Sequence, residues 1–106
     1  MKNEKAESCT LRNIKGVSLS KYQKQSEILA ALSNATRLAI LEIMMEYGEV
    51  CTCELESALN IPQSTVTVHI HKLYQNGLLK KREEWKFTYY SIDRTHEDLI
   101  RKVLKG

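Results

Sequence analysis

The chain has 106 residues and a net charge of +3, with 16 Lys and Arg against 13 Asp and Glu. This length fits one domain with a modest core, which favours stabilisation by a second copy of the chain. No apolar run is long enough to span a bilayer, and the polar residues 1–5 lack the apolar core of a signal peptide. We therefore expect a cytoplasmic protein without a membrane partner.

Charge is unevenly distributed along the chain. Residues 38–62 contain five Glu and no Lys or Arg, whereas residues 1–37 contain seven Lys or Arg and three Glu. Residues 63–106 contain nine Lys or Arg and five Asp or Glu. Basic ends around an acidic middle favour binding to a polyanion such as DNA, although a protein with merely uneven surface charge has the same pattern.

The chain divides into an arm and a folded domain. Residues 1–18 are polar and weakly patterned, which is typical of a flexible N-terminal arm. Residues 19–106 carry periodic apolar patterns throughout and are expected to form the domain. One of the three cysteines, Cys9, lies in the arm.

The first part of the domain predicts three helices. Apolar residues at helical spacing predict a helix over residues 20–32, followed by a break and a cap at residues 33–34. The next apolar pattern predicts a second helix over residues 36–47, ended by Gly48. A short third helix is expected over residues 52–59.

A turn at residues 60–62 leads into a fourth helix, over about residues 63–76, whose two faces differ. Pro62 suits the entry to a helix, and the Asn76-Gly77 pair suits its end. The apolar face carries Val66, Ile70 and Leu73. The opposite face carries Gln63, Ser64, Thr67, Val68, His71 and Gln75.

The last part of the chain predicts a hairpin and a final helix. Residues 78–82 and 86–92 are strand-like and join through residues 83–85. Residues 94–105 form the last helix, with a stripe of apolar residues that suits a core or a dimer interface. The order α-α-α-α-β-β-α predicts a mainly α-helical fold with a small β-hairpin, a winged helix-turn-helix, and we expect a homodimer.

The second helix of a helix-turn-helix lies in the major groove of DNA with its first residues against base edges. Small polar side chains such as Gln, Ser and Thr suit that task, and basic side chains suit phosphates. We predict these residues as contacts to double-stranded operator DNA: Gln63, Ser64, Thr65, Thr67, Val68, His69, His71, Lys72, Lys81, Arg82 and Lys86. For any single lysine among them, an ordinary solvated side chain is the alternative.

The sequence resembles a known family. Residues 32–41, LSNATRLAIL, are similar to the L-x-x-x-T-R-x-x-I-L signature of the ArsR/SmtB family, whose members are dimeric winged-helix repressors that sense metals and metalloids. Residues 59–79 resemble the recognition helix of that family, and residues 85–91 resemble its wing. The resemblance covers about residues 25–92. One departure is the wing tip, where family members often carry Gly and this chain has Glu83-Glu84, two acids that would repel phosphate.

The resemblance implies that Cys51-Thr52-Cys53 is a ligand site at the start of the third helix. Residues i and i+2 do not share a helix face, so both sulfurs reach one ion only if Cys51 precedes the helix, as a cap at Thr52 would allow. A helix N-terminus lowers the pKa of a thiol, which favours thiolate. Neither cysteine lies in an apolar run, so a role in the core fits poorly.

A third thiolate is available from Cys9. In the similar cadmium- and lead-sensing members, the arm of one subunit supplies Cys to the Cys-x-Cys pair of the other, and Cys9 fits that role. Three thiolates suit soft ions that accept three ligands, namely arsenite, antimonite, bismuth, lead and cadmium, whereas zinc and cobalt prefer four. The effector expected is therefore a soft metal or metalloid ion, and no organic cofactor is predicted.

Other sites and functions fit less well. The family's zinc site on the last helix needs a second His that this helix lacks, so Asp93, His96 and Glu97 are interpreted as a helix cap and a solvated face. No acid is placed to orient a Cys/His pair, and there is no phosphate loop, so no enzyme is predicted. The sequence thus predicts a repressor that releases its operator when the ion binds Cys51, Cys53 and Cys9. A thiol-redox regulator that uses the same cysteines and a repressor without a ligand are the alternatives.

Overall fold

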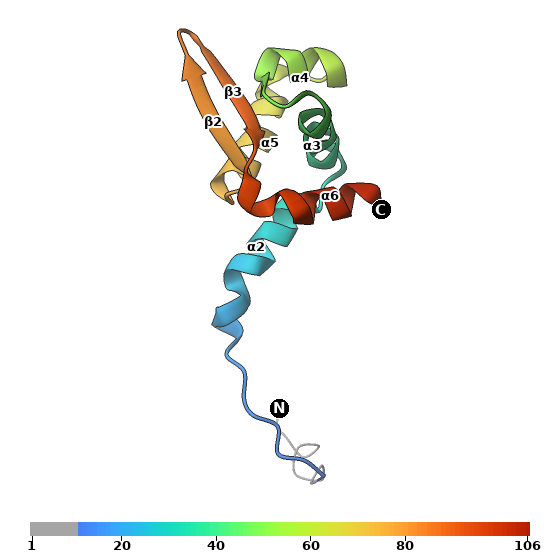
Figure 1. Cartoon of the computed structure of the whole chain (residues 1–106), viewed down its shortest axis with the longest axis vertical. Helices are drawn as coiled ribbons and strands as arrows, with labels where there is room; N and C mark the ends of the chain where they lie inside the picture. Colours follow the sequence, from blue (N-terminus) through green and yellow to red (C-terminus); the bar gives the residue numbers. More distant parts are fainter. Residues whose placement is uncertain (1–10) are drawn as a thin grey trace.

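A computed structural model of the chain describes residues 11–106 (Figure 1), so Cys9 lies outside the described residues. Residues 11–18 form no helix or strand and are exposed, and the trace leads away from the domain. The elements that follow are η1 (Leu19–Tyr22), α2 (Gln23–Leu32), α3 (Ala35–Tyr47), β1 (Val50–Cys51), α4 (Thr52–Leu59), α5 (Gln63–Gln75), β2 (Leu79–Glu84), β3 (Phe87–Ile92), η2 (Arg94–His96) and α6 (Glu97–Lys105). The predicted winged helix-turn-helix is confirmed, with one strand more than expected.

The start and end of α3 follow from two local interactions. Asn34 has an extended backbone, and its side-chain oxygen accepts a hydrogen bond from the backbone N–H of Arg37 at 3.0 Å. Gly48 ends the helix with a φ of 82°, a conformation that costs a glycine little. The break, the cap and the end predicted for this helix are confirmed.

The core lies where the helices meet the base of the hairpin. Its largest fully buried side chains come from α3, α4, α5, α6 and the segment before β2: Ile40, Leu41, Leu55, Leu73, Leu78, Ile100 and Val66. The predicted apolar face of α5 is confirmed, since Val66, Ile70 and Leu73 are all buried. This burial fixes the rotation of α5 and leaves its polar face toward solvent.

The strand β1 was not predicted. In the described residues β1 pairs with β3 on the side opposite β2, which gives a three-stranded antiparallel sheet in the order β1-β3-β2. Val50 lies opposite Tyr90, and Cys51 lies opposite Tyr89. Two residues are too few to show an alternating pattern in sequence, so only the fold reveals this strand. The consequence is that Cys51 belongs to the sheet that carries the hairpin.

The hairpin of β2 and β3, called the wing below, has its turn later than expected, because β2 ends two residues later and β3 begins one residue later than predicted. Glu83 pairs with Thr88 and Glu84 pairs with Phe87, so both acids belong to β2. The turn consists of Trp85 and Lys86, and Trp85 has a φ of 61°. The prediction that Glu83-Glu84 forms the wing tip is therefore wrong, because the strand pairing extends past both residues.

The last helix is preceded by a short 3₁₀ turn. Asp93 caps that turn by accepting a hydrogen bond from the backbone N–H of Thr95 at 2.9 Å, which confirms its predicted role as a cap. His96 Nδ1 donates to the carbonyl oxygen of Gly77 at 3.0 Å. This hydrogen bond holds the start of α6 against the end of α5.

No single helix within residues 11–106 is long and apolar enough to cross a membrane. The segments Leu19–Leu32 and Ala35–Tyr47 meet the length and composition criteria only as a pair, across a bend of 85°. The apolar residues Ile40, Leu41 and Met44 of that pair are buried in the core of this domain.

Candidate functional site

The helices α4 and α5 form a helix-turn-helix. Asn60 closes α4 in the left-handed conformation, with φ 56° and ψ 48°, and its N–H donates to the carbonyl oxygen of Glu56 at 2.8 Å. Pro62 has an extended backbone and precedes the first residue of α5. This tight connection presents the start of α5 to solvent, as a recognition helix requires.

Most of the side chains predicted to contact DNA are exposed to solvent rather than buried in the core. All but one of the predicted contacts on α5 and the wing are exposed: Gln63, Ser64, Thr65, Thr67, Val68, His71, Lys72, Lys81, Arg82 and Lys86. Gln63 also donates a hydrogen bond to the hydroxyl oxygen of Thr52 at 3.3 Å. The first residue of α5 therefore contacts the first residue of α4.

The exception is His69, which faces α3. Arg37 donates from Nη1 to His69 Nδ1 at 3.2 Å and from Nε to the carbonyl oxygen of Ala31 at 2.7 Å. Burial, and then the charge of Arg37, lower the pKa of His69, which favours the neutral ring that accepts this hydrogen bond. One arginine thus ties the end of α2 and the start of α3 to the middle of α5.

The basic residues of the wing are held by neighbours. Lys81 lies over the ring of Tyr74, 5.1 Å from its centroid, and Lys86 lies 5.0 Å from the centroid of Trp85. Arg82 Nη1 donates to Glu84 at 2.6 Å, and its other donors contact Glu49. Lys81 and Lys86 keep exposed ammonium groups, whereas the guanidinium of Arg82 already has two carboxylate partners.

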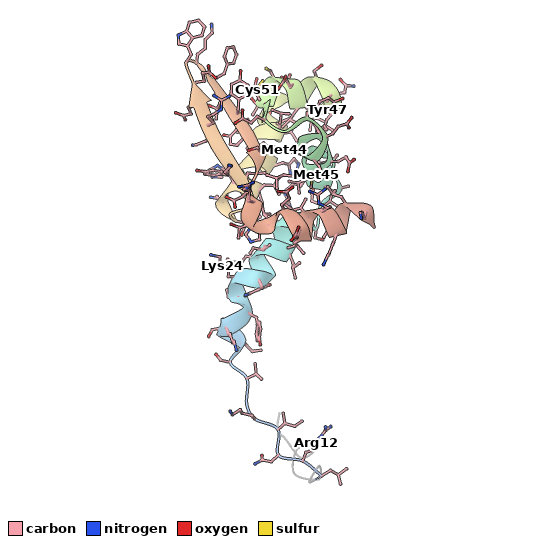
Figure 2. All side chains as sticks on the ribbon, viewed as in Figure 1. Arg12, Lys24, Met44, Met45, Tyr47 and Cys51 are labelled. Carbon is pink, nitrogen blue, oxygen red and sulfur yellow. The ribbon has the colours of Figure 1, made fainter. Side chains whose placement is uncertain are left out.

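Cys51 and Cys53 meet at the start of α4. Cys51 is the N-cap, with an extended backbone of φ −100° and ψ 165°, and Cys53 lies in the first turn. The Sγ atoms are 3.0 Å apart, so both sulfurs point to one place (Figure 2 shows Cys51 between the wing strands and α4). The expectation that Cys51 precedes the helix is confirmed, but the cap is Cys51 itself rather than Thr52.

Two further expectations are wrong for Cys51, namely that it lies outside the core and that its pKa is lowered. Cys51 is buried although no apolar run surrounds it, because β1 places it against β3, while Cys53 is exposed. Burial, and then the hydrogen bond with Cys53, raise the pKa of Cys51, and the opposing backbone hydrogen bond from Glu54 is smaller. Desolvation therefore outweighs the effect of the helix N-terminus at this thiol.

Glu54 fixes the backbone around the sulfurs. Its carboxylate accepts a hydrogen bond from the N–H of Cys51 at 2.9 Å, and its own N–H points to the Cys51 sulfur, which together make a capping box. Within residues 11–106 no group of three His, Cys, Asp or Glu side chains could hold a metal ion. The described chain thus contributes a sulfur pair, and the third predicted ligand, Cys9, lies outside it.

Sequence reasoning missed three of the residues that shape these sites. In the sequence, Arg37 stands out only as part of the motif at residues 32–41, and Glu49 and Glu54 are only two of the five acids of residues 38–62. A Glu three residues after a helix start is a recognisable capping signal, so Glu54 could have been found. The partners of Arg37 and Glu49 are 32 and 33 residues away, and no local pattern signals them.

The architecture defines a winged helix-turn-helix protein, and comparisons with known proteins identify the family. The family model described as bacterial regulatory protein, arsR family, matches residues 34–81. An uncharacterised HTH-type transcriptional regulator of Methanocaldococcus jannaschii is 37% identical over 87 residues, which cover 80% of this chain and 97% of that protein. The chain belongs to the ArsR family of DNA-binding transcriptional regulators.

Two staphylococcal relatives carry more specific names. An arsenical resistance operon repressor of Staphylococcus aureus is 30% identical over 83 residues, 77% of this chain and 79% of the repressor. A cadmium resistance transcriptional regulatory protein CadC homolog of Staphylococcus aureus is 32% identical over 79 residues, 74% of this chain and 65% of that protein. These relatives are transcriptional regulators rather than enzymes, in agreement with the sequence prediction.

Solved structures show the same fold. The homodimeric winged helix-turn-helix DNA-binding domain of a possible ArsR-family regulator from Mycobacterium bovis has a TM-score of 0.74 at 24% identity, covering 85% of this chain and 86% of that one. HlyU from Vibrio cholerae has a TM-score of 0.73 at 26% identity, covering 83% of this chain and 96% of that one.

Proposed function

We propose that this chain is a homodimeric cytoplasmic repressor that releases its operator when a soft metal or metalloid ion binds Cys51 and Cys53. The observation that carries the proposal is the 3.0 Å separation of the two sulfurs at the start of the helix that precedes the recognition helix. Cys9 supplies the third thiolate, and residues 1–18 act as the arm that delivers it.

The chemistry of the sulfur pair selects soft ions. Arsenite, antimonite, bismuth, lead and cadmium bind thiolates strongly and accept three ligands, whereas zinc favours a fourth ligand. Burial favours the protonated form of the Cys51 thiol. An ion that binds the Cys51 sulfur replaces that proton. The names of the staphylococcal relatives, an arsenical repressor and a cadmium regulator, support this class of effector.

The proposed DNA contacts fall into two groups. The exposed residues at the start of α5 read base edges, with Gln63 suited to adenine and Val68 suited to the methyl group of thymine. His71, Lys72, Lys81 and Lys86 contact the backbone. Arg82, the remaining predicted contact, is held by Glu49 and Glu84 and reaches a phosphate only when Glu49 releases it. Because His69 is turned toward Arg37, we assign it to positioning α5, which differs from its predicted role as a contact.

Two contacts connect the sulfur pair to the DNA-binding elements. Thr52, between the two cysteines, accepts the hydrogen bond from Gln63 at the start of α5. Cys51 itself pairs with Tyr89 in the wing strand β3. An ion that draws Cys51 and Cys53 together with Cys9 therefore changes both the start of α5 and the middle of the wing strand β3. Coupling of about 1–3 kcal/mol between effector and DNA is typical of such linkage.

The test is an anaerobic titration of the reduced full-length chain with arsenite, cadmium, lead and zinc. Sulfur-to-metal absorption reports binding, and Cys9→Ser and Cys53→Ser are compared with the wild type. We expect one soft ion per protomer, loss of binding in Cys53→Ser and weakened binding in Cys9→Ser. The absence of thiolate binding by all four ions would reject the metal-sensing proposal and leave its DNA-binding part to be tested separately.

Thiol oxidation is the second candidate, and the 3.0 Å sulfur separation also favours it. The structure of reduced HlyU from Vibrio cholerae shares the fold at 26% identity and a TM-score of 0.71. Hydrogen peroxide would accept two electrons from two thiols, whose two protons leave in the two waters formed, as a disulfide forms. Thiol titration together with DNA binding, before and after peroxide and before and after arsenite, separates the two candidates.

A further inference from the structure

The wing tip carries an exposed indole in an unusual backbone conformation. Trp85, the only tryptophan of the chain, is 88% exposed and has a φ of 61°. Lys86 follows it in the turn, and its ammonium lies over the rings of Trp85 and Phe87, at 5.0 and 6.0 Å from their centroids. Phe87, the first residue of β3, is 41% exposed. Two aromatic rings and one cation therefore form the outermost part of the wing.

Folding alone does not account for this residue. A left-handed backbone costs about 1 kcal/mol or more for a residue with a Cβ, and glycine would avoid that cost. A fully exposed indole contributes no burial energy in return. A strained residue with a large exposed apolar side chain is typical of a contact surface.

The surroundings of Trp85 favour nucleic acid as the partner. The wing follows α5 directly in the chain, and Tyr74 of α5 contacts Tyr90 of β3 edge to face, with 6.3 Å between ring centroids. Exposed lysines line the wing at positions 80, 81 and 86. The wing thus packs against the end of the proposed recognition helix and carries three exposed lysines, of which Lys86 lies at the tip.

The aromatic rings of the tip decide which part of DNA it fits. Glu84 is paired with Arg82 at 2.6 Å, but Glu83 is exposed, and its carboxylate disfavours close approach to phosphates. Proteins that bind the minor groove frequently insert apolar side chains, Phe among them, between its base steps. The tip therefore suits the groove interior better than the phosphate ridge.

We infer that Trp85 is a DNA-contacting residue that packs its indole into the minor groove while α5 occupies the neighbouring major groove. This inference rests on the proposed DNA binding and adds one contact residue and one groove to it. Phe87 and Lys86 flank the indole, and Lys86 reaches the nearer backbone. The predicted contact set included Lys86 but not Trp85.

The test uses Trp85 as its own reporter, because no second tryptophan contributes emission. The reduced full-length chain is titrated at low salt with mixed-sequence duplex DNA of 40 base pairs carrying a fluorescein label. Label anisotropy measures binding, and Trp emission with acrylamide quenching measures protection of the indole. We expect Trp85 to become protected as the duplex binds.

Trp85→Gly separates the contact from the fold. Glycine suits the positive φ, so the variant should melt at the wild-type temperature or above it, while its affinity for the duplex falls roughly fivefold or more. Tyr47→Ala is the matched control, since Tyr47 is 70% exposed and lies on α3 (Figure 2). That control should bind the duplex as the wild type does.

The groove is identified by comparing alternating dG–dC and dI–dC duplexes, which differ only by the amino group that guanine places in the minor groove. We expect tighter binding and stronger protection of Trp85 on dI–dC, and loss of that preference in Trp85→Gly. A preference that persists in Trp85→Gly would reject the minor-groove placement.

Failure of the inference and failure of the proposed function are distinguishable. If the wild type does not bind duplex DNA at all, the proposed function fails and the inference fails with it. If the wild type binds, but Trp85 stays exposed and Trp85→Gly binds equally well, only the inference is overturned. A blue shift of Trp85 with anionic phosphatidylglycerol vesicles, but not with DNA, would overturn it in favour of a lipid surface.

Discussion

Glu49 holds Arg82 of the wing through a bidentate ion pair. Arg82 Nε donates to both carboxylate oxygens of Glu49 at 2.9 and 3.1 Å, and Nη2 donates to one of them at 2.9 Å. The third guanidinium nitrogen, Nη1, donates to Glu84. The hydrogen bond with Arg82 lowers the pKa of Glu49, and the guanidinium lies 4.9 Å from the centroid of the Tyr89 ring. Glu49 directly precedes β1, so this pair joins the segment before Cys51 to the wing.

The first prediction concerns Glu49→Gln. Loss of the carboxylate frees Arg82 to contact a DNA phosphate, because one of its two acidic partners no longer competes. Affinity for duplex DNA at low salt should rise, and the slope of log affinity against log salt should steepen by about one phosphate contact. Anisotropy titrations at several salt concentrations measure both quantities.

Glu46→Gln is the control for this prediction. Glu46 is an exposed acid on the neighbouring helix α3, so its removal changes net charge equally without touching Arg82. An equal rise of affinity in both variants would show that charge alone matters. No change of the salt slope in Glu49→Gln would show that Arg82 does not reach DNA.

The second prediction concerns Glu54→Gln. The amide weakens the capping box that holds the backbone of Cys51, and loss of a helix cap costs about 1 kcal/mol. The melting temperature should therefore fall, and soft-ion binding should weaken because the sulfur pair is less well positioned. Calorimetry and the arsenite titration test the two effects. Glu56→Gln, on the same helix but outside the box, should match the wild type, and equal losses in both variants would contradict this role.

The order of elements could be predicted because it depends on local signals. The apolar faces of α3 and α5, the Asn34 cap and the Gly48 end all appear within short windows of sequence. The same is true of the Cys-x-Cys spacing at the start of α4. These features need no knowledge of distant partners.

The remaining features depend on pairing between distant segments. The strand at Val50 and Cys51 exists because Tyr90 and Tyr89 lie beside it, and this pairing is what buries Cys51. The turn position at Trp85 depends on how far β2 and β3 stay in register. Since register and burial are tertiary properties, sequence reasoning placed the wing tip two residues early and gave the Cys51 pKa the wrong direction.

The third prediction is a pH dependence that originates at His69. Burial and Arg37 lower its pKa below the ordinary value of 6.5. The unfolded chain therefore binds the proton at higher pH than the folded chain does, so stability falls as the pH drops through 6.5 toward the lowered pKa. His69→Gln should lose part of this acid sensitivity, measured as melting temperature between about pH 7.5 and 5.5.

His71→Gln is the comparison for the third prediction, since His71 lies on the same helix and is exposed. It should keep the acid sensitivity of the wild type. Identical pH profiles for the wild type and both variants would show that protonation of His69 does not affect folding.

The last prediction tests the proposed dimer through the apolar residues that α2 and α6 leave uncovered. Leu29 is 56% exposed, Leu99 and Val103 are each 36% exposed, and Leu29 and Leu99 line a shallow groove of about 280 Å³. Covering the exposed part of such side chains stabilises association by roughly 25 cal/mol per Å² of apolar area removed from water, so a charge placed among them should weaken association. Leu29→Asp with Leu99→Asp should raise the dimer dissociation constant roughly tenfold or more and reduce operator affinity in parallel, because half-site binding needs two subunits.

Sedimentation velocity over a range of concentrations measures the shift in the dimer dissociation constant. Tyr47→Asp, a substitution at an exposed aromatic of α3, should leave that constant unchanged. If the double variant stays dimeric while it remains folded, the interface lies elsewhere.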